Sequence, residues 1–174
     1  MKLTLLQLQA LAQIAVKFFP TCVIGGGAPR DAAADVDIKD IDLFIDIRLM
    51  GHDDYEKAVE AFRLALGGTV RPTSTPSVEA ERSYDLDAPG YPVIQLLPVY
   101  RCVYRDVFDY DFGFSQIAMT EHGLLVSHKW VKDGVNDTIT YTKKSPDPKS
   151  AARLQRLKAK YPDRRFVNCE ELEG

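Results

Sequence analysis

The chain has 174 residues, of which 45% are hydrophobic and 10% aromatic, and its net charge is −3. This length predicts one domain with its own core, and the composition excludes an intrinsically disordered chain. Polar residues interrupt the apolar stretch at 3–19, so we expect no signal peptide, no membrane contact and a cytoplasmic location.

The first elements lead directly into a glycine turn. Apolar residues recur at helical spacing over 4–19 and predict an amphipathic helix that Pro20 closes. A short apolar strand at 21–24 then enters three consecutive glycines. Because Gly26 and Gly27 have no side chains, backbone N–H groups can approach phosphate there, and the helix expected at 28–35 adds partial positive charge.

Two carboxylates follow on the next expected strand, 38–47. Asp40 and Asp42 are two residues apart, so on a strand they point to the same face and can share a divalent metal ion. A phosphate cradle beside a metal clamp predicts a nucleotidyl-transfer site, with Mg²⁺ or Mn²⁺ as cofactor and an NTP as substrate.

This segment resembles the head domain of class II tRNA nucleotidyltransferases and bacterial poly(A) polymerases, in the polymerase-β-like superfamily. The resemblance rests on an apolar strand, Gly-Gly-x-x-Arg-Asp, a short helix and Lys-Asp-Ile-Asp-Leu, and it is strong only over 21–46. It implies that Asp40 and Asp42 bind metal, that Gly26 and Gly27 present amides to the triphosphate, and that Arg30 contacts phosphate or stabilises the loop.

The segment departs from the family wording after Arg30-Asp31. The family usually has Leu-Leu-Gly-Arg there, whereas this chain has Ala-Ala-Ala-Asp-Val at 32–36. The turn must then be made differently, and we expect Asp35 to make it as a cap or an Asx-turn.

Further elements complete a small sheet. We expect a helix at 53–66 that ends at Gly67-Gly68, a mobile loop at 71–76 that covers the cleft, and strands at 91–100 and 106–119. In the last strand Asp109, Asp111, Gly113 and Ser115 alternate with aromatic residues.

The resemblance also implies a third carboxylate on a neighbouring strand, in a pattern like Asp-apolar-x-apolar-Asn/Ser. Asp111 fits that wording, and Asp109 is the fallback. A different alignment places the position at Gln95, where an amide would imply weak or absent catalysis.

The end of the chain is expected to carry the basic charge. We predict a hairpin of 123–132 with 138–143, a helix at 150–161 and a loose tail. Residues 143–165 contain nine Lys or Arg against two Asp. This segment suits contact with a polyanion, for which the candidate residues are Lys149, Arg153, Arg156 and Lys160. The alternative is an ordinary solvated helix face.

Together these features predict one α+β domain over 1–174, with a small mixed sheet and helices mainly on one side. Residues 1–120 would form the catalytic core, and 121–174 the hairpin, basic helix and tail. The expected function is transfer of an NMP from an NTP to an acceptor. The resemblance and the basic segment favour an RNA 3′ end as that acceptor, and the resemblance implies the cytosol of a bacterium or of a phage-infected host. The alternatives are a protein or small-molecule adenylyltransferase and a non-catalytic nucleotide- or RNA-binding regulator.

Overall fold

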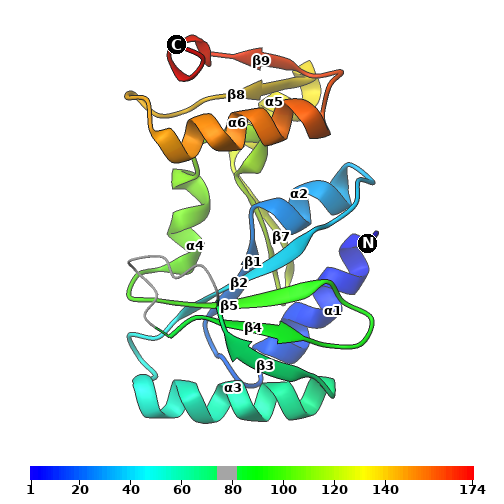
Figure 1. Cartoon of the computed structure of the whole chain (residues 1–174), viewed down its shortest axis with the longest axis vertical. Coiled ribbons are helices and arrows are strands. Elements are labelled where there is room, and N and C mark those ends of the chain that lie inside the picture. The colour runs from blue at the N-terminus through cyan, green and yellow to red at the C-terminus, as the bar shows by residue number, and fades with distance from the viewer. Residues whose placement is uncertain (74–81) are drawn as a thin grey trace.

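The main sheet is mixed and forms the centre of the molecule. The structure, a computed structural model, describes residues 1–73 and 82–174 (Figure 1). The sheet order is β3-β4-β5-β2-β1-β6-β7, with β2 and β5 parallel and the other neighbours antiparallel. The strands are β1 (Cys22–Gly25), β2 (Asp40–Asp46), β3 (Thr69–Pro72), β4 (Tyr84–Asp87), β5 (Val93–Val99), β6 (Ile117–Thr120) and β7 (Gly123–Val126).

The helices lie around this sheet and at its upper end in Figure 1. They are α1 (Leu5–Ala15), α2 (Gly27–Ala33), α3 (His52–Leu66), α4 (Val103–Asp106), α5 (His128–Asn136) and α6 (Pro148–Lys160). Two short strands, β8 (Thr138–Thr140) and β9 (Arg165–Val167), pair in parallel as a second small sheet. No helix in the described parts of the chain is long and apolar enough to cross a lipid bilayer.

Local sequence explains where the two long N-terminal helices begin and end. Thr4 and Gln7 form a capping box at the start of α1, each side chain bonding the other residue's backbone N–H. Gly67 ends α3 in the left-handed conformation, with φ of 68°. Both helices pack on one face of the sheet, whereas α4 packs on the other face and α6 belongs to a separate core. The expected α+β fold with a mixed sheet is confirmed.

The side chains of β2 point alternately into the core and toward the opposite face of the sheet. Ile41, Leu43 and Ile45 are fully buried against α1 and α3. Because side chains alternate along a strand, Asp40 and Asp42 point away from that core. The face of the sheet opposite α1 and α3 therefore carries the two carboxylates.

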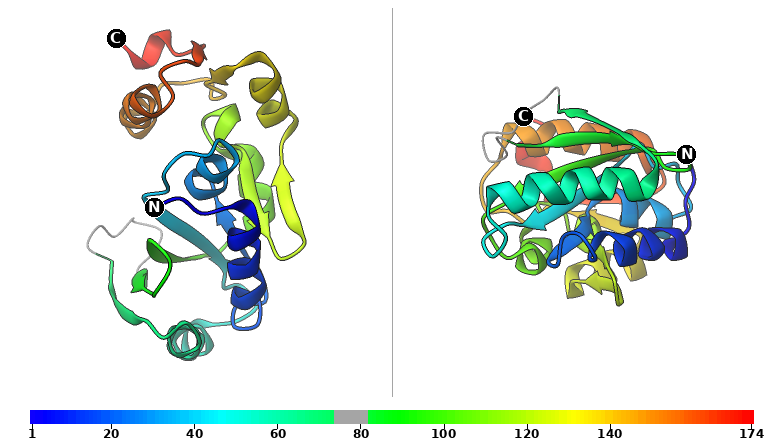
Figure 2. Two further views of the ribbon diagram at one scale, coloured as in Figure 1. Left: turned by 90° about the vertical axis from the view of Figure 1, so that its right-hand side faces the viewer. Right: turned by 90° about the horizontal axis from the view of Figure 1, so that it is seen from below.

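A second hydrophobic core stands at the end of the molecule that carries the C-terminus (Figures 1 and 2). We call residues 128–174 the C-terminal cap. Its core includes Leu154 and Leu157 of α6 and Tyr161, and Phe112 and Phe114 pack into it from the preceding segment. The cap places α6 over the carboxylate-bearing face.

The predicted strand at 106–119 is wrong for most of its length. Residues 107–109 and 113–115 form two 3₁₀ turns, and only β6 at its end is a strand. Of the four alternating aromatic residues, Phe112 and Phe114 are buried in the cap core, Tyr110 packs against a separate cluster that includes Val23, and Phe108 is exposed. The alternation of period two therefore belongs to an irregular connection here and not to a strand.

The predicted hairpin at 123–143 is also wrong. Helix α5 occupies its middle, and its N-terminus is capped by the Ser127 hydroxyl, which accepts from the Trp130 N–H. Asp133 on this helix accepts hydrogen bonds from the hydroxyls of Thr138 and Thr140 at 2.6 Å each. Strand β8 therefore pairs with β9 instead of β7.

Smaller differences concern loops. The tail is ordered into β9 and a 3₁₀ turn at 170–172, and β3 occupies 69–72, where the expected loop begins. The rest of that loop, 74–76, lies outside the described residues. Asp35 makes the turn after α2 by adopting a positive φ of 54°, while its carboxylate pairs with Lys2.

Candidate active site

Asp40 and Asp42 lie on the face of β2 opposite α1 and α3, and they line a cavity of about 590 Å³. Asp40 is partly exposed, 4.0 Å from the Lys39 ammonium. Within the described residues Asp42 makes no hydrogen bond or ion pair. Burial, reinforced by the Asp40 charge, raises the pKa of Asp42 to about 6. An anionic, unpaired carboxylate beside a second one suits a divalent cation.

The glycine turn lies directly beside these carboxylates. Gly26 has a φ of 54°, and its N–H already donates to the Ile117 carbonyl at 3.0 Å. Helix α2 starts at Gly27, so the Gly27 and Ala28 N–H groups have no partner within the helix. Gly27 rather than Gly26 is therefore the residue whose amide is free to meet an anion.

Arg30 is held by its own helix, by the 3₁₀ turn at 113–115 and by the C-terminal end of α6, and it does not extend freely into the cavity. Its guanidinium donates to Asp31 at 2.9 Å and to the Ser115 hydroxyl at 3.0 Å, and it lies 5.6 Å from the Tyr161 ring centre. Asp31 also accepts from Lys160 and the Tyr161 hydroxyl. We call this buried group, Arg30, Asp31, Lys160 and Tyr161, the α2–α6 latch. Of the two roles expected for Arg30, stabilising the loop matches these contacts.

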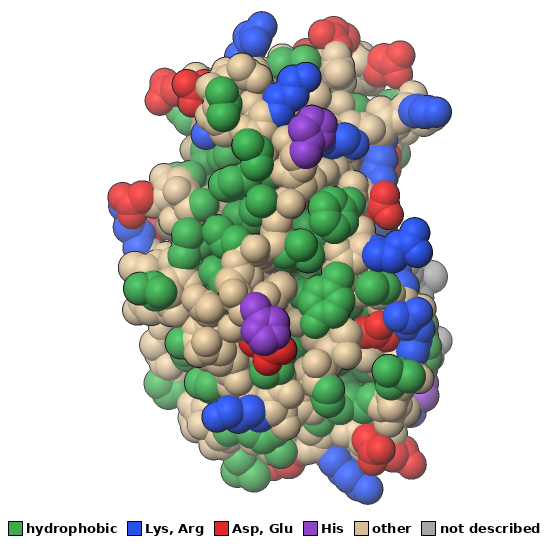
Figure 3. Space-filling view, turned by 180° about the vertical axis from the view of Figure 1, so that it is seen from behind, with side chains coloured by type: hydrophobic (Ala, Val, Ile, Leu, Met, Phe, Trp, Pro, Cys, Tyr) green, Lys and Arg blue, Asp and Glu red, His purple; other side chains and the backbone are tan. Residues whose placement is uncertain are grey.

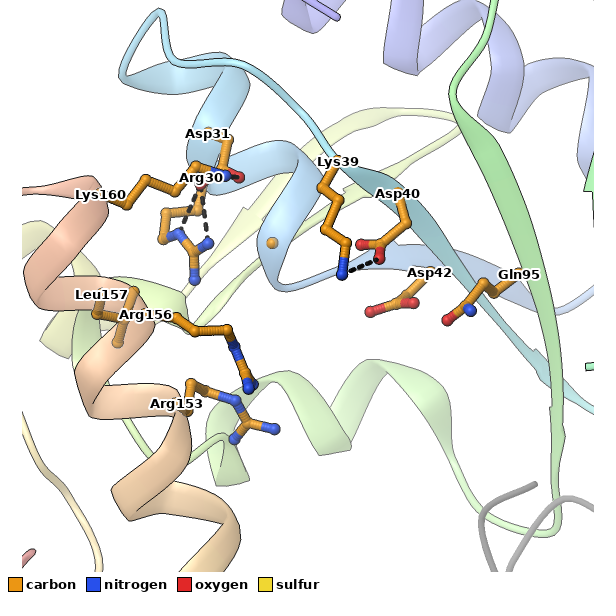
Figure 4. Close-up of a pocket in the computed structure, with 11 residues that line it drawn as sticks. Arg30, Asp31, Lys39, Asp40, Asp42, Gln95, Arg153, Arg156, Leu157 and Lys160 are labelled. Atoms are coloured by element: carbon orange, nitrogen blue, oxygen red, sulfur yellow. Dashed lines mark hydrogen bonds and ion pairs between the residues drawn. The ribbon is translucent and has the colours of Figure 1, made fainter. Parts of the chain in front are cut away.

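Helix α6 forms the wall opposite the carboxylates (Figure 4). Arg153, Arg156 and Lys160 project from successive turns of this helix into the cavity. Lys149, the fourth candidate for nucleic-acid contact, is exposed and does not line the cavity. The cavity is lined by Gly27, Arg30, Asp31, Lys39, Asp40, Asp42, Gln95, Arg153, Arg156, Leu157 and Lys160.

The lining combines acceptors and cations in the way a metal–triphosphate complex requires. Five lining residues are Lys or Arg and three are Asp. Asp40 and Asp42 lie on the sheet, and Arg153 and Arg156 of α6 face them across the cavity (Figure 4). The third carboxylate, Asp31, lies on α2 and pairs with Lys160. Such a division offers a cation site on one side and a polyanion site on the other.

A smaller cavity of about 140 Å³ continues beneath the glycine turn, between Asp42, Tyr110 and Asp111. The Tyr110 hydroxyl is buried there and has no hydrogen-bond partner among the described residues. A Cβ atom on Gly25 would lie 2.5 Å from this hydroxyl and 2.7 Å from the Phe44 ring. Because Gly25 has no side chain, Tyr110 and Phe44 can pack directly against the backbone of β1; we call this contact the floor of the site.

Asp111 reaches the same region by a different route from the one expected. It lies between the two 3₁₀ turns, not on a strand, and its carboxylate accepts from the Ser150 hydroxyl at 2.6 Å and pairs with Arg153. Asp109 is exposed in the first turn. Among the described residues no three Asp, Glu, His or Cys side chains form a group able to hold a metal ion.

Gln95 occupies the position beside Asp42. Strands β2 and β5 are parallel, and their register pairs Asp42 with Gln95. Gln95 is the residue at which the alternative alignment placed the third position. Asp85 pairs with Gln95 from the other side, on β4, a strand that was not predicted.

Solved structures of CCA-adding enzymes have the same fold. A Thermotoga maritima CCA-adding enzyme in complex with tRNA matches with a TM-score of 0.68 at 16% identity, over 98% of this chain and 44% of that one. A CCA-adding enzyme with ATP matches with a TM-score of 0.71 at 18% identity, over 95% and 41%. A tRNA nucleotidyltransferase with a primer tRNA and an ATP analogue matches with 0.63 at 15% identity, over 95% and 48%.

These likenesses establish the fold. The chain spans less than half of the length of each of these structures. No family model and no curated protein sequence matches the chain. The chain therefore shares the fold of these CCA-adding and tRNA nucleotidyltransferase structures, which confirms the expected α+β fold.

Proposed function

We propose that the chain is a metal-dependent nucleotidyltransferase, which moves an NMP from an NTP to an acceptor and releases pyrophosphate. The observation that carries the proposal is the cavity in which Asp40 and Asp42 face Arg153, Arg156 and Lys160 (Figure 4). The fold shared with CCA-adding enzymes supports it.

The carboxylates fit a divalent ion, Mg²⁺ or Mn²⁺, because Asp42 has no protein partner in the described chain and Asp40 lies on the same face. A cation held there would supply charge stabilisation at the reacting phosphate. The α6 cations would orient the triphosphate, and the Gly27 N–H would bind a phosphate oxygen. Asp111 would position Arg153 for this contact, through the pair that joins them.

The reaction is an in-line displacement. The acceptor oxygen forms a bond to the α-phosphorus, the bond to the bridging oxygen breaks, and pyrophosphate leaves with the electron pair. The hydroxyl proton leaves to solvent water. Positioning and charge stabilisation therefore carry most of the catalysis.

The test is transfer of label from each α-labelled NTP, with Mg²⁺ or Mn²⁺, to RNA, protein and small-molecule acceptors in parallel. We expect labelled RNA as the product. In the double variant Asp40→Asn with Asp42→Asn, the rate of label transfer should fall at least about 100-fold. Asp54→Asn with Asp163→Asn, two exposed carboxylates, is the matched control. Label on protein instead would identify an adenylyltransferase of proteins.

Gln95 favours one second candidate, a domain that binds nucleotide or RNA without transfer. An amide beside Asp42 cannot accept a proton from an acceptor hydroxyl. This candidate predicts saturable NTP binding with no labelled product on any acceptor, in the same assay.

We place the RNA contact on the exposed basic segment of the cap. Arg153 and Arg156 line the NTP cavity, so their replacement cannot separate RNA binding from NTP binding. Lys144 and Lys149 are exposed and lie outside the lining. The rear face shown in Figure 3 is a poorer candidate, since hydrophobic side chains gather there and charges are sparse at its centre.

Charge reversal tests this contact. We expect Lys144→Glu with Lys149→Glu to raise the KM for RNA about tenfold, because contacts with RNA phosphates are lost, and to reduce the salt dependence of RNA binding. The KM for NTP should stay unchanged, because neither lysine lines the cavity. Lys17→Glu with Lys57→Glu, two exposed lysines on other elements, is the control. Equal RNA affinity for both pairs at low salt would remove the basis for an RNA acceptor on this surface.

A further inference from the structure

A continuous row of polar side chains crosses four strands and ends at Asp42. The strand registers pair Arg71 with Asp85, Asp85 with Gln95, and Gln95 with Asp42. Residues directly opposite each other in a sheet point to the same face. All four side chains therefore lie on the face that carries the cavity, with Gln95 between two carboxylates.

The hydrogen bonds of this row fix the orientation of the Gln95 amide. Its Nε2 donates to Asp85 Oδ1 at 3.4 Å. Asp85 is buried and also accepts from the Thr73 hydroxyl at 3.0 Å, with the Arg71 guanidinium 3.5 Å away. Because an ionised carboxylate only accepts, the NH₂ of Gln95 must face Asp85. The carbonyl oxygen is then directed toward Asp42, as Figure 4 shows.

This orientation completes a set of three oxygen-bearing side chains at the cavity. Asp40 and Asp42 supply carboxylates, and Gln95 supplies a neutral carbonyl oxygen of the kind that binds hard divalent cations. A carboxylate at position 95 would instead face Asp85 across a hydrogen-bond distance and be repelled by it. The amide is thus the side chain that Asp85 permits at this place.

We propose that Gln95 Oε1 is the third side-chain oxygen of the cation site formed by Asp40 and Asp42, that Asp85 is the residue that positions it, and that the site holds one divalent cation. The inference rests on the proposed function and adds its metal stoichiometry. With two carboxylates in place of three, the site has less negative charge to balance a second divalent ion.

The test is Mn²⁺ binding to the full chain without nucleotide. Binding is measured from the electron paramagnetic resonance signal of free Mn²⁺ and by calorimetry. We expect one Mn²⁺ per chain and loss of binding in Asp40→Asn. Gln95→Leu should weaken Mn²⁺ binding about tenfold, and Asp85→Asn by a similar factor because the orienting acceptor is lost. Gln155→Leu, at an exposed glutamine on α6, is the matched control and should bind as the unchanged chain does.

Exchanging the charges of positions 85 and 95 distinguishes a metal ligand at position 95 from a residue that only stabilises the sheet. Asp85→Asn with Gln95→Glu keeps a donor–acceptor pair between the strands but moves the charge next to Asp42. We expect this double variant to bind Mn²⁺ at least about tenfold more tightly than the unchanged chain, and to take up a second ion. Thermal unfolding of each variant shows whether it is folded.

The outcomes separate the two proposals. If Asp40→Asn abolishes binding while Gln95→Leu and the charge exchange leave affinity and stoichiometry unchanged, the Gln95 inference is overturned and the proposed function stands. Two Mn²⁺ per unchanged chain would overturn the single-ion site. No Mn²⁺ binding by the unchanged chain would overturn the metal-dependent function itself.

Discussion

At the scale of single residues, Asp42 is held in a position that disfavours its charge. Its pKa rises from an ordinary value of 3.8 to about 6, chiefly through burial and then through Asp40. The folded chain therefore binds a proton more tightly than the unfolded chain does. Ionised Asp42 lowers stability above pH 6, and this cost disappears as the pH falls below about 4.

The first prediction follows from this sign. Without divalent metal at pH 7, Asp42→Asn should raise the free energy of unfolding by about 1 to 3 kcal/mol, because the buried charge is removed. At pH 4 the two proteins should unfold alike. Thermal and urea unfolding in chelator at both pH values provide the measurement, and equal stability at pH 7 would contradict the burial of this charge.

Gly25 makes a second prediction at the same scale. In Gly25→Ala the new methyl group would meet the Tyr110 hydroxyl and the Phe44 ring at under 3 Å. We expect a loss of about 1 to 3 kcal/mol of stability from this overpacking. Gly134→Ala on α5 is the control, since no atom lies within 4 Å of its added Cβ. If Gly25→Ala left the free energy of unfolding unchanged, Tyr110 and Phe44 would have to move aside at no cost, and the overpacking argument would be wrong.

At the scale of elements, α6 is oriented by its contacts with the segment before β6. Asp111 accepts from Ser150 and pairs with Arg153, one turn apart on α6. Asp111 was assigned to metal binding because it fits the family's pattern Asp-apolar-x-apolar-Asn/Ser. The two apolar residues of that pattern, Phe112 and Phe114, pack into the cap core from an irregular connection, so the pattern reflects packing of a connection and not of a strand.

The two roles of Asp111 predict different kinetics. As an anchor of α6, Asp111→Asn should lower stability by about 1 to 3 kcal/mol, because Ser150 and Arg153 lose a buried charged acceptor, and should raise the KM for NTP. As a metal ligand it would instead reduce kcat with the KM unchanged. Steady-state kinetics with denaturant unfolding measure both, and Asp109→Asn at an exposed site is the control.

At the scale of the molecule, two hydrophobic cores meet across the cavity. The α2–α6 latch joins them, with Asp31 accepting from Arg30, Lys160 and Tyr161 in a buried group. The latch sets the separation between the carboxylates on the sheet and the cations on α6. The geometry of the cavity therefore depends on contacts that do not involve substrate.

The fourth prediction concerns this latch. Asp31→Asn leaves two cations without their buried counter-charge and should destabilise the chain by about 3 to 5 kcal/mol. Amide exchange in α6 should accelerate more than exchange in β2, because the cap loses its attachment first. Hydrogen exchange by mass spectrometry measures the difference, with Asp163→Asn as an exposed control. Uniform acceleration in both elements would show that the cap and sheet unfold together.

Much of the site could be predicted from sequence because its signals are local. The glycine turn, α2 and the carboxylates of β2 occupy one continuous segment, 24–46, and helical or strand periodicity fixes their relative directions. The α+β class follows from the same periodicities. Helix α6 was expected within two residues of its observed ends for the same reason.

What only the tertiary structure decided is how distant segments meet. The choice between Asp111 and Gln95 depends on which strand lies beside β2, and strand neighbours are set by packing rather than by local pattern. The latch and the α6 wall join residues about 130 positions apart in sequence. The sequence by itself thus determined the phosphate turn and the carboxylate pair, whereas long-range packing determined what faces them.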